Sequence, residues 1–358
     1  MSQFNNLYRL FFKKRTNISG KSLSSSQLKV RSFTVNRDIL TKSSSTFQVL
    51  ETPIAIESGD IVGMYDIYGT VLFLGVVDYI EDNTVEASQM LDIFDDDWLW
   101  NNPSETTLEE TLKTIITNDY QNSTDELLNE TFGVFDIQTT TSTNQTLESQ
   151  ESQYVVNFSN FLYSIYEKYS IMLNFEIPFE ENTPTIQIGI PNYEKLTISN
   201  NAFVFRNFDI TTNIFETNKL VVYSEDGTTL RGTFYATTSG ITEDSEALNR
   251  PQKVKTNIVF SDDDLNIVKA SNLRNQIYNH EITVEMIIDN QLLSIEDIHL
   301  GQEVDLFYNG TYYNTILTGY SIAMTDGIDD GIITLKFGLV RTTLTSKLFK
   351  RLGSKNGG

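Results

Sequence analysis

The chain has 358 residues, a formal net charge of −22, no cysteine and only two histidines, His280 and His299. This length exceeds that of one compact core, and the hydrophobic fraction of 39%, with 22 Phe and 17 Tyr, is enough for several β-rich cores. The composition excludes disulfides, thiol chemistry, cysteine-based zinc sites and multi-histidine metal centres, and no apolar run approaches the roughly 20 residues of a membrane span.

The charge is unevenly placed. Residues 1–32 hold seven basic side chains and residues 341–358 hold five, and neither segment has an acidic one. The residues between them carry 14 basic and 48 acidic side chains, a charge of −34. Such a body argues against a nucleic-acid-binding surface, because phosphate binding needs cations. The basic ends fit docking onto acidic neighbours, or are solvated tails.

The first part of the chain reads as an arm followed by a barrel. Residues 1–27 form a basic N-terminal arm, within which residues 7–14 are either an edge strand or a short helix. The basic residues here follow the apolar ones, the reverse of a signal peptide, so we expect assembly in a cytoplasm. Residues 28–95 alternate apolar and polar side chains between turn residues, which predicts a first small β-barrel.

The hydrophobic period then changes, and residues 96–200 are expected to form an α/β domain. Residues 121–150 are polar and are interpreted as a long surface excursion. Apolar residues at helical spacing, with N-terminal helix signals, predict helices beginning near Leu108 and over 159–169. Alternating apolar residues predict strands over 171–177 and 185–190.

From residue 201 onwards the chain is β-rich again. We predict a second barrel from residues 201–224 plus 292–346, an inserted α+β domain at 225–291, and a basic C-terminal tail at 347–358. In the insertion, an Asp226-Gly227 turn is typical of a hairpin. A helix from Leu265 and a strand over 280–287 follow.

Two hairpins, one in each predicted barrel, have the same pattern. Each has a Gly turn (Gly59 and Gly301), a strand with alternating apolar residues, a Gly-Thr hairpin loop (Gly69 and Gly310) and a second strand interrupted by glycine. The alternative is that any two hairpins look alike. If the repeat is real, one chain carries two equivalent barrels and three chains present six in a ring.

Candidate chemistry is sparse. Two aspartate runs invite a metal interpretation, but neither has EF-hand spacing, and surface charge or helix N-terminal acids explain both. No nucleophile, phosphate-loop or zinc-protease motif is present, and paired carboxylates are uninformative among 48 acids. We therefore assign no catalytic, cofactor-binding or metal residue and expect no enzyme and no cofactor. The acidic candidates weighed are Asp92, Asp95, Asp96, Asp97, Asp262, Asp263, Asp264 and the turn at 326–331.

Several segments together resemble the tail-hub, or baseplate-hub, proteins of tailed bacteriophages and phage-like particles, also called tail-associated proteins. The resemblance covers about residues 28–348; the arm at 1–27 is not part of it. The matching segments are residues 56–62, 74–81, 89–95, 108–112, 279–282, 300–304 and 337–348.

The resemblance implies a β-rich, multi-domain α+β protein with two pseudo-repeated small barrels and two inserted α/β domains. It implies a structural virion protein: a homotrimeric hub that closes the distal end of a tail tube and joins it to the baseplate or tail tip. Expected partners are the distal tail protein, the tail tube and the tape measure protein, with DNA passing through an acidic channel. The alternatives are a receptor- or glycan-binding tail-tip module and, more weakly, a cell-wall hydrolase subunit.

Overall fold

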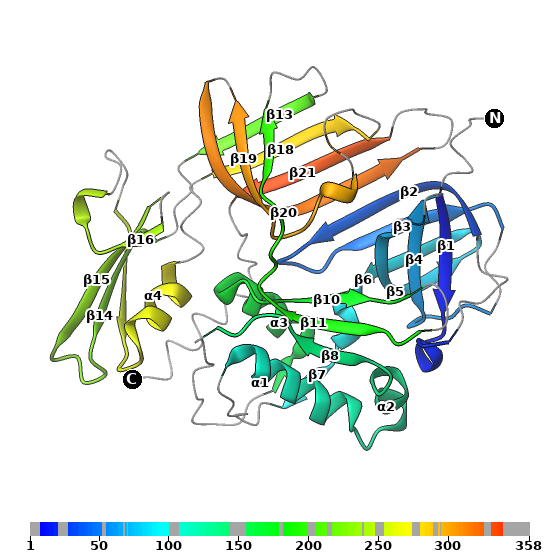
Figure 1. The fold of residues 1–358 in the computed structure, drawn as a ribbon, viewed down its shortest axis with the longest axis horizontal. Coiled ribbons are helices and arrows are strands. Elements are labelled where there is room, and N and C mark those ends of the chain that lie inside the picture. The colour runs from blue at the N-terminus through cyan, green and yellow to red at the C-terminus, as the bar shows by residue number, and fades with distance from the viewer. Residues whose placement is uncertain are drawn as a thin grey trace.

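The fold is described by a computed structural model. It places residues 8–20, 28–51, 55–66, 69, 71–99, 107–143, 155–178, 182–199, 205–212, 217–237, 240–247, 254–273, 280–288, 293, 295–308, 310–325 and 331–338. Two six-stranded units lie side by side, an α/β layer covers one end of the first, and a small sheet with one helix stands to the side (Figure 1). The predicted β-rich α+β fold class is confirmed.

The first unit is a closed barrel, in which β2 returns to β1 in the order β1-β4-β5-β6-β3-β2. The strand β1 comes from the predicted arm. It pairs with β4 along its whole length, and Leu10 and Phe12 are fully buried in the barrel core. Of the two conformations expected for residues 7–14, the strand is therefore the observed one. The six strands are β1 (Tyr8–Lys13), β2 (Leu28–Asp38), β3 (Ser44–Val49), β4 (Ile61–Asp66), β5 (Val71–Glu81) and β6 (Thr84–Gln89).

The second unit has the strand order β12-β19-β20-β21-β18-β13. Its membership differs from that of the expected second barrel: residues 280–287, assigned to the insertion, form a central strand of this unit, whereas residues 219–223 pair in a separate sheet. Alternation identifies a strand but not its partner, which long-range contacts select. The strands are β12 (Leu196–Ser199), β13 (Phe205–Thr212), β18 (His280–Ile287), β19 (Glu303–Tyr308), β20 (Thr311–Met324) and β21 (Ile332–Gly338).

An α/β layer lies beneath the first barrel, around an aromatic core in which Phe94 stacks on Phe132 at 4.9 Å and Phe158 on Tyr120 at 5.3 Å. The predicted surface excursion over 121–150 is wrong in its first half, because α2 and β8 lie there and Phe132 is fully buried. The elements are β7 (Asp97–Leu99), α1 (Leu108–Ile115), a π-helix (Ile116–Gln121), α2 (Glu126–Phe132), β8 (Asp136–Thr139), β9 (Val155–Asn157), α3 (Phe158–Tyr169), β10 (Met172–Glu176) and β11 (Thr185–Gly189).

The small sheet has the order β16-β15-β14-β17 and packs α4 on one face through Leu220, Phe234 and Val268. Gly227 has a φ of 70°, as the predicted Asp-Gly turn requires. The elements are β14 (Lys219–Tyr223), β15 (Leu230–Thr237), β16 (Gly240–Thr242), β17 (Thr256–Phe260) and α4 (Leu265–Leu273). The described residues also include four 3-10 helices: Arg15–Asn17, Met90–Phe94, Ser245–Ala247 and Ile295–Asp297.

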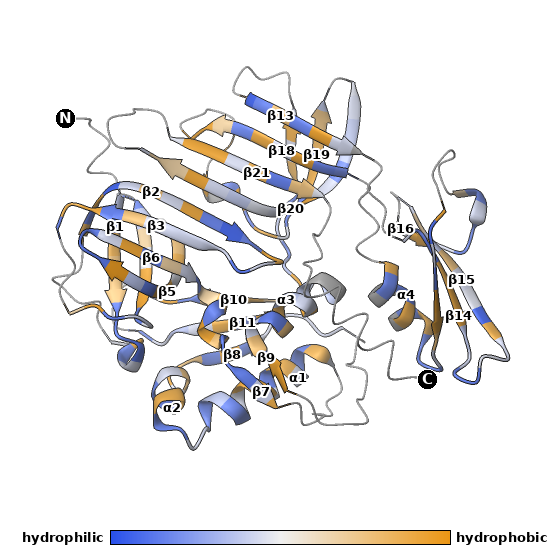
Figure 2. Cartoon of the chain, turned by 180° about the vertical axis from the view of Figure 1, so that it is seen from behind, coloured by the Kyte–Doolittle hydropathy of each residue, from blue (hydrophilic) through white to orange (hydrophobic). Residues whose placement is uncertain are grey.

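The first barrel and the second six-stranded unit share one continuous sheet, because β2 pairs with β20. The shared path runs β5-β6-β3-β2-β20-β21-β18-β13. Apolar and polar residues alternate along these strands, visible as colour bands in Figure 2, so one face is buried in the barrel cores and the other is polar. None of the helices described is long and apolar enough to cross a membrane.

Candidate assembly interface

The two repeated hairpins begin with turns that are built alike. Gly59 and Gly301 both lie at positive φ (91° and 81°), and each N–H donates to the second strand of its hairpin. In the first barrel the Gly59 N–H donates to the Val77 carbonyl (2.8 Å), and in the second the Gly301 N–H donates to Leu317 (2.9 Å). The next residue closes each turn with its side chain: Asp60 accepts the Glu57 N–H (2.9 Å), and Gln302 accepts the His299 N–H (3.1 Å). These paired turns confirm the predicted repeat.

The register of the strands extends the equivalence beyond the hairpins. The β5–β6 ladder has a bulge between Val77 and Tyr79, and the β20–β21 ladder has one between Leu317 and Gly319. Aligning Val77 with Leu317 therefore aligns both the turn contacts and the bulges. Between these aligned residues the first hairpin is two residues longer than the second, and a bulge between Met64 and Tyr65 accommodates one of the two.

A further equivalence, between β2 and β13, was not found in the sequence. Paired residues lead from β5 through β6 and β3 to β2 in the first unit, and from β20 through β21 and β18 to β13 in the second. This correspondence aligns Phe33 of β2 with Phe208 of β13. The β2–β3 ladder has a bulge at Arg31, and the β13–β18 ladder has one at the aligned Arg206. The signal was present as an Arg-x-Phe pair in each strand, but these bulges break the strict alternation by which strands are recognised.

The junction between the barrels is a six-residue antiparallel ladder. Residues 33–38 of β2 pair with residues 319–324 of β20, from Phe33 opposite Met324 to Asp38 opposite Gly319. A side chain at position 319 would crowd this ladder, because its Cβ would lie 3.1 Å from the Arg37 carbonyl oxygen. The long β20 serves both barrels, since residues 311–316 pair with β19 before the strand crosses to β2.

The outward face of the shared sheet is polar and carries both signs of charge. Thr34, Thr46, Ser321, Thr334 and Thr283 lie along it on adjacent strands. The negative charge of the body is therefore not concentrated on this face. Its charged side chains, none of them buried, include Glu81, Glu86, Asp209, Glu281 and Glu285 and the basic Lys29, Arg31, Arg206 and Lys336.

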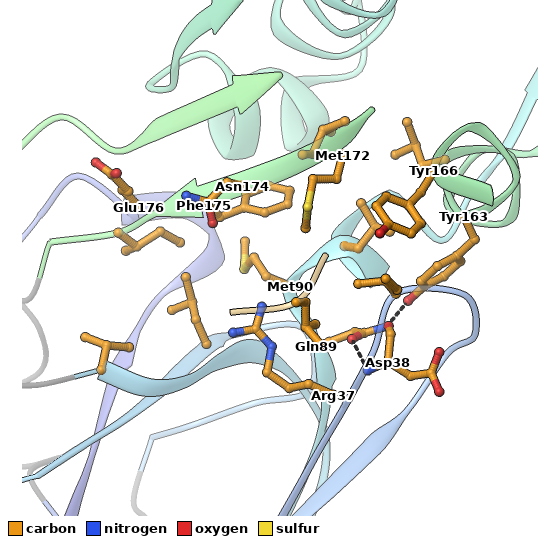
Figure 3. Close-up of a pocket in the computed structure, with 18 of the residues that line it drawn as sticks. Arg37, Asp38, Gln89, Met90, Tyr163, Tyr166, Met172, Asn174, Phe175 and Glu176 are labelled. Atoms are coloured by element: carbon orange, nitrogen blue, oxygen red, sulfur yellow. Dashed lines mark hydrogen bonds between the residues drawn. The ribbon is translucent and has the colours of Figure 1, made fainter. Parts of the chain in front are cut away.

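A cavity of about 470 Å³ lies beside the junction, between β2, the end of β6, α3 and β10 (Figure 3). Met90 and Met172 face it from opposite sides, and Arg37 points into it from β2. The Arg37 Nε is buried and makes no hydrogen bond within the placed parts of the chain. Gln89 fixes one wall, because its amide donates to the carbonyl oxygens of Asp38 (3.0 Å) and Thr41 (3.1 Å).

The same Gln89 amide donates to the Tyr163 hydroxyl, which donates to Asp92 Oδ1 (3.3 Å). Burial raises the pKa of Asp92 to about 7, partly opposed by the Lys42 ammonium. Burial likewise raises the pKa of Tyr163, so its hydroxyl stays protonated as a donor. The chain of contacts ties the first barrel to α3 and offers no nucleophile.

The residues weighed as metal ligands do not converge. Asp95 pairs with Lys42 and accepts from Asn157 (2.8 Å), and Asp264 accepts the Asn266 N–H (2.7 Å) at the start of α4. Among the described residues, no three acidic or histidine side chains are placed to hold a metal ion. Residues 326–330 lie outside the described chain, as do the basic ends at 1–7, 21–27 and 339–358.

The two histidines have different surroundings. His280 is buried at the start of β18, edge-on to the Tyr313 ring, and burial lowers its pKa to about 4. His299 stacks on Tyr193 with ring centroids 4.3 Å apart. Burial also lowers the pKa of His299, opposed by the nearby Asp297 carboxylate and reinforced by Arg37.

No family model and no curated protein matches the sequence. Three solved structures are similar over nearly their whole length. A tail protein from Neisseria meningitidis MC58 is 10% identical, with 93% of this chain and 96% of that chain covered and a TM-score of 0.57. The prophage tail protein gp18 from Listeria monocytogenes EGD-e is 14% identical, with 98% and 100% covered and a TM-score of 0.52. The 43 kDa tail protein of prophage MuSo2 from Shewanella oneidensis is 11% identical, with 93% and 98% covered and a TM-score of 0.51. The chain therefore has the fold of prophage tail proteins.

Proposed function

We propose that this chain is a structural hub protein of a phage or phage-like tail, in which three copies form a ring of six barrels. The ring would close the distal end of the tail tube and join it to the baseplate or tail tip. The shared fold with three tail proteins supports a place in a tail. The acidic body with basic ends would suit contacts with the tube, the distal tail protein and the tape measure protein.

The observation that carries the proposal is the internal repeat. The first barrel and the second six-stranded unit share their turn contacts, their bulges and the order of their strands, and one ladder joins them. A contact between two equivalent units that uses different surfaces on each is head-to-tail, and repeating it gives a closed ring or a helix. Three chains supply the six units that match a six-fold tube. The α/β layer and the small sheet would decorate this ring.

The polar face of the shared sheet is our choice for the wall of the channel. It carries Ser, Thr, Asn and Gln among mixed charges, which offers no concentrated cationic surface to bind DNA phosphates. The weakly acidic or neutral wall replaces the strongly acidic one expected from net charge alone. We propose transient passage of DNA without specific binding, assembly in the host cytoplasm, and no catalytic activity.

The test is the mass and symmetry of the purified chain. Light scattering coupled to size-exclusion chromatography should give about three times 40.8 kDa, and electron microscopy should show a ring with six similar lobes. A protein that stays monomeric at micromolar concentration and in the presence of tail extracts would refute the hub. Turnover of peptidoglycan that a single Asp or Glu substitution abolishes would refute the non-enzymatic role.

A further inference from the structure

Two strand edges of the shared sheet have no partner strand within the described part of the chain. β13 pairs with β18 on one side only. β5 pairs with β6 up to Glu81, but its ladder with β4 covers only residues 71–76, so the last residues extend beyond β4. Tyr79 in this extension is 46% exposed. These edges stand at the two ends of the strand path that begins with β5 and ends with β13.

The second barrel shows how such an extension is used. β20, which corresponds to β5, pairs with β19 over residues 311–316 and then extends beyond it. That extension is the part that pairs with β2 of the neighbouring barrel, over residues 319–324. The junction inside the chain joins β2 to the end of β20. Because β13 corresponds to β2 and β5 corresponds to β20, each chain also has the two strands of a second such junction, and these two strands do not pair with each other within the chain.

We propose that β13 of one copy pairs with the end of β5 in the next copy, in the register set by the β2–β20 junction. This inference rests on the proposed ring. In the alignment fixed by the bulges, Asn36 corresponds to Thr211 and Ser321 to Glu81. Asn36 lies opposite Ser321, so Thr211 lies opposite Glu81 of the next copy.

The next pair follows from the same register. Arg37 opposite Tyr320 predicts Thr212 opposite Ile80. The pairing is antiparallel and head-to-tail, so it extends the sheet from chain to chain and gives both of these strand ends a partner once the ring closes. It is shorter than its template, because β5 ends at Glu81 and turns into β6, whereas β20 continues to Met324.

Cysteine cross-linking tests the register directly, because the chain has no cysteine of its own. The variant carries Thr211→Cys with Glu81→Cys, two exposed positions on the polar face. Directly opposed residues of an antiparallel pair have Cα atoms about 4.5–5.5 Å apart, within the range of a disulfide. Mild oxidation should give disulfide-linked dimers and trimers, which a reducing agent should convert back to monomers on a denaturing gel.

Two control variants frame this result. Asn36→Cys with Ser321→Cys, the template pair, should give an internal disulfide and a covalent monomer of altered mobility. Asp209→Cys with Glu81→Cys keeps the same face but is two residues out of register, about 6.6 Å along the strand. It should give several-fold less covalent trimer than the in-register pair.

The outcomes separate this inference from the ring itself. Trimers by light scattering in which Thr211→Cys and Glu81→Cys stay unlinked, or link no better than the out-of-register pair, would overturn the strand pairing and leave the ring standing. A chain that stays monomeric while the template pair still forms its internal disulfide would overturn both. Covalent trimers from the in-register pair alone support the pairing.

Discussion

Replacing Asp92 with asparagine should stabilise the folded chain at pH 8 and leave its stability at pH 4 almost unchanged. The Asp92 carboxyl is only 7% exposed and accepts one hydrogen bond, from the Tyr163 hydroxyl at 3.3 Å. Its other oxygen is buried and accepts none from the described residues. Desolvation of the charged form is the main reason that the pKa of Asp92 is raised to about 7.

The sign follows from linkage. A carboxyl whose pKa is higher in the folded chain than in the unfolded chain contributes stability below the unfolded pKa of 3.8, and this stability is lost as the pH rises through about 7. The two pKa values limit the loss to roughly 4 kcal/mol. Asparagine has no charged form, so the difference in free energy of unfolding between Asp92→Asn and wild type should grow by up to that amount from pH 4 to pH 8.

Urea denaturation followed by tryptophan fluorescence, repeated at half-unit intervals of pH, measures this difference. Asp97→Asn is the matched control, because Asp97 lies five residues along the chain and is exposed, so this substitution removes a carboxylate that folding does not bury. Comparing variants with wild type at each pH cancels the contribution of every other titrating group. A constant difference between Asp92→Asn and wild type across this range would refute the assignment of a buried, costly charge.

Five further substitutions, in three groups, test other parts of the structure. Gly59→Ala and Gly301→Ala should each lower the free energy of unfolding, measured by urea denaturation, by roughly 1–2 kcal/mol, because both positions have positive φ. Gly301→Ala should lower it more, since its Cβ would lie 3.0 Å from Pro191, and equal losses would contradict this crowding. Asp60→Ala should lower the free energy of unfolding by about 2–4 kcal/mol and Gln302→Ala by about 1–2 kcal/mol. The Asp60 carboxylate of the first turn makes stronger hydrogen bonds than the Gln302 amide of the second, and the reverse order of losses would count against equivalent turns. His280→Leu should reduce the fall in melting temperature between pH 7 and pH 4, because burial lowers the pKa of His280 to about 4 and the unfolded chain takes up the proton from about pH 6.5 downwards; an unchanged fall would reject this source of acid sensitivity.

The hairpins were predictable because their signals are local. A glycine at positive φ, alternating apolar residues and a Gly-Thr loop lie within about 20 residues of chain, and each signal has a direct physical cause. The helix at 158–169 was predictable for the same reason, since its buried residues recur at helical spacing.

Elements that depend on distant contacts were harder to predict. The strand β1 has basic neighbours typical of a solvated tail, yet Lys13 is buried and donates to the Ile18 carbonyl oxygen (3.0 Å), so its charge gave a misleading signal. The helix α2 was hidden by its polar surroundings, although Asp125 accepts the N–H groups of Leu127 and Leu128 as an N-cap. A short helix that buries little besides Phe132 lacks the periodicity that identifies longer ones.

The β2 and β13 equivalence shows what the repeat preserves. Of the eight aligned positions from 30–37 and 205–212, only the Arg and the Phe of the Arg-x-Phe pair are identical. The two strands keep their inward-facing apolar residues, one bulge and the register of their ladders, because these features determine how each strand edge pairs with its neighbour. The junction inside the chain covers six residue pairs, and the one proposed between chains has two described pairs. Chain separation should therefore precede separation of the two barrels, so diluted trimers should release monomers in which the Asn36→Cys and Ser321→Cys disulfide still forms. Loss of that disulfide on dilution would mean that the two junctions are of similar strength, against the difference in ladder length.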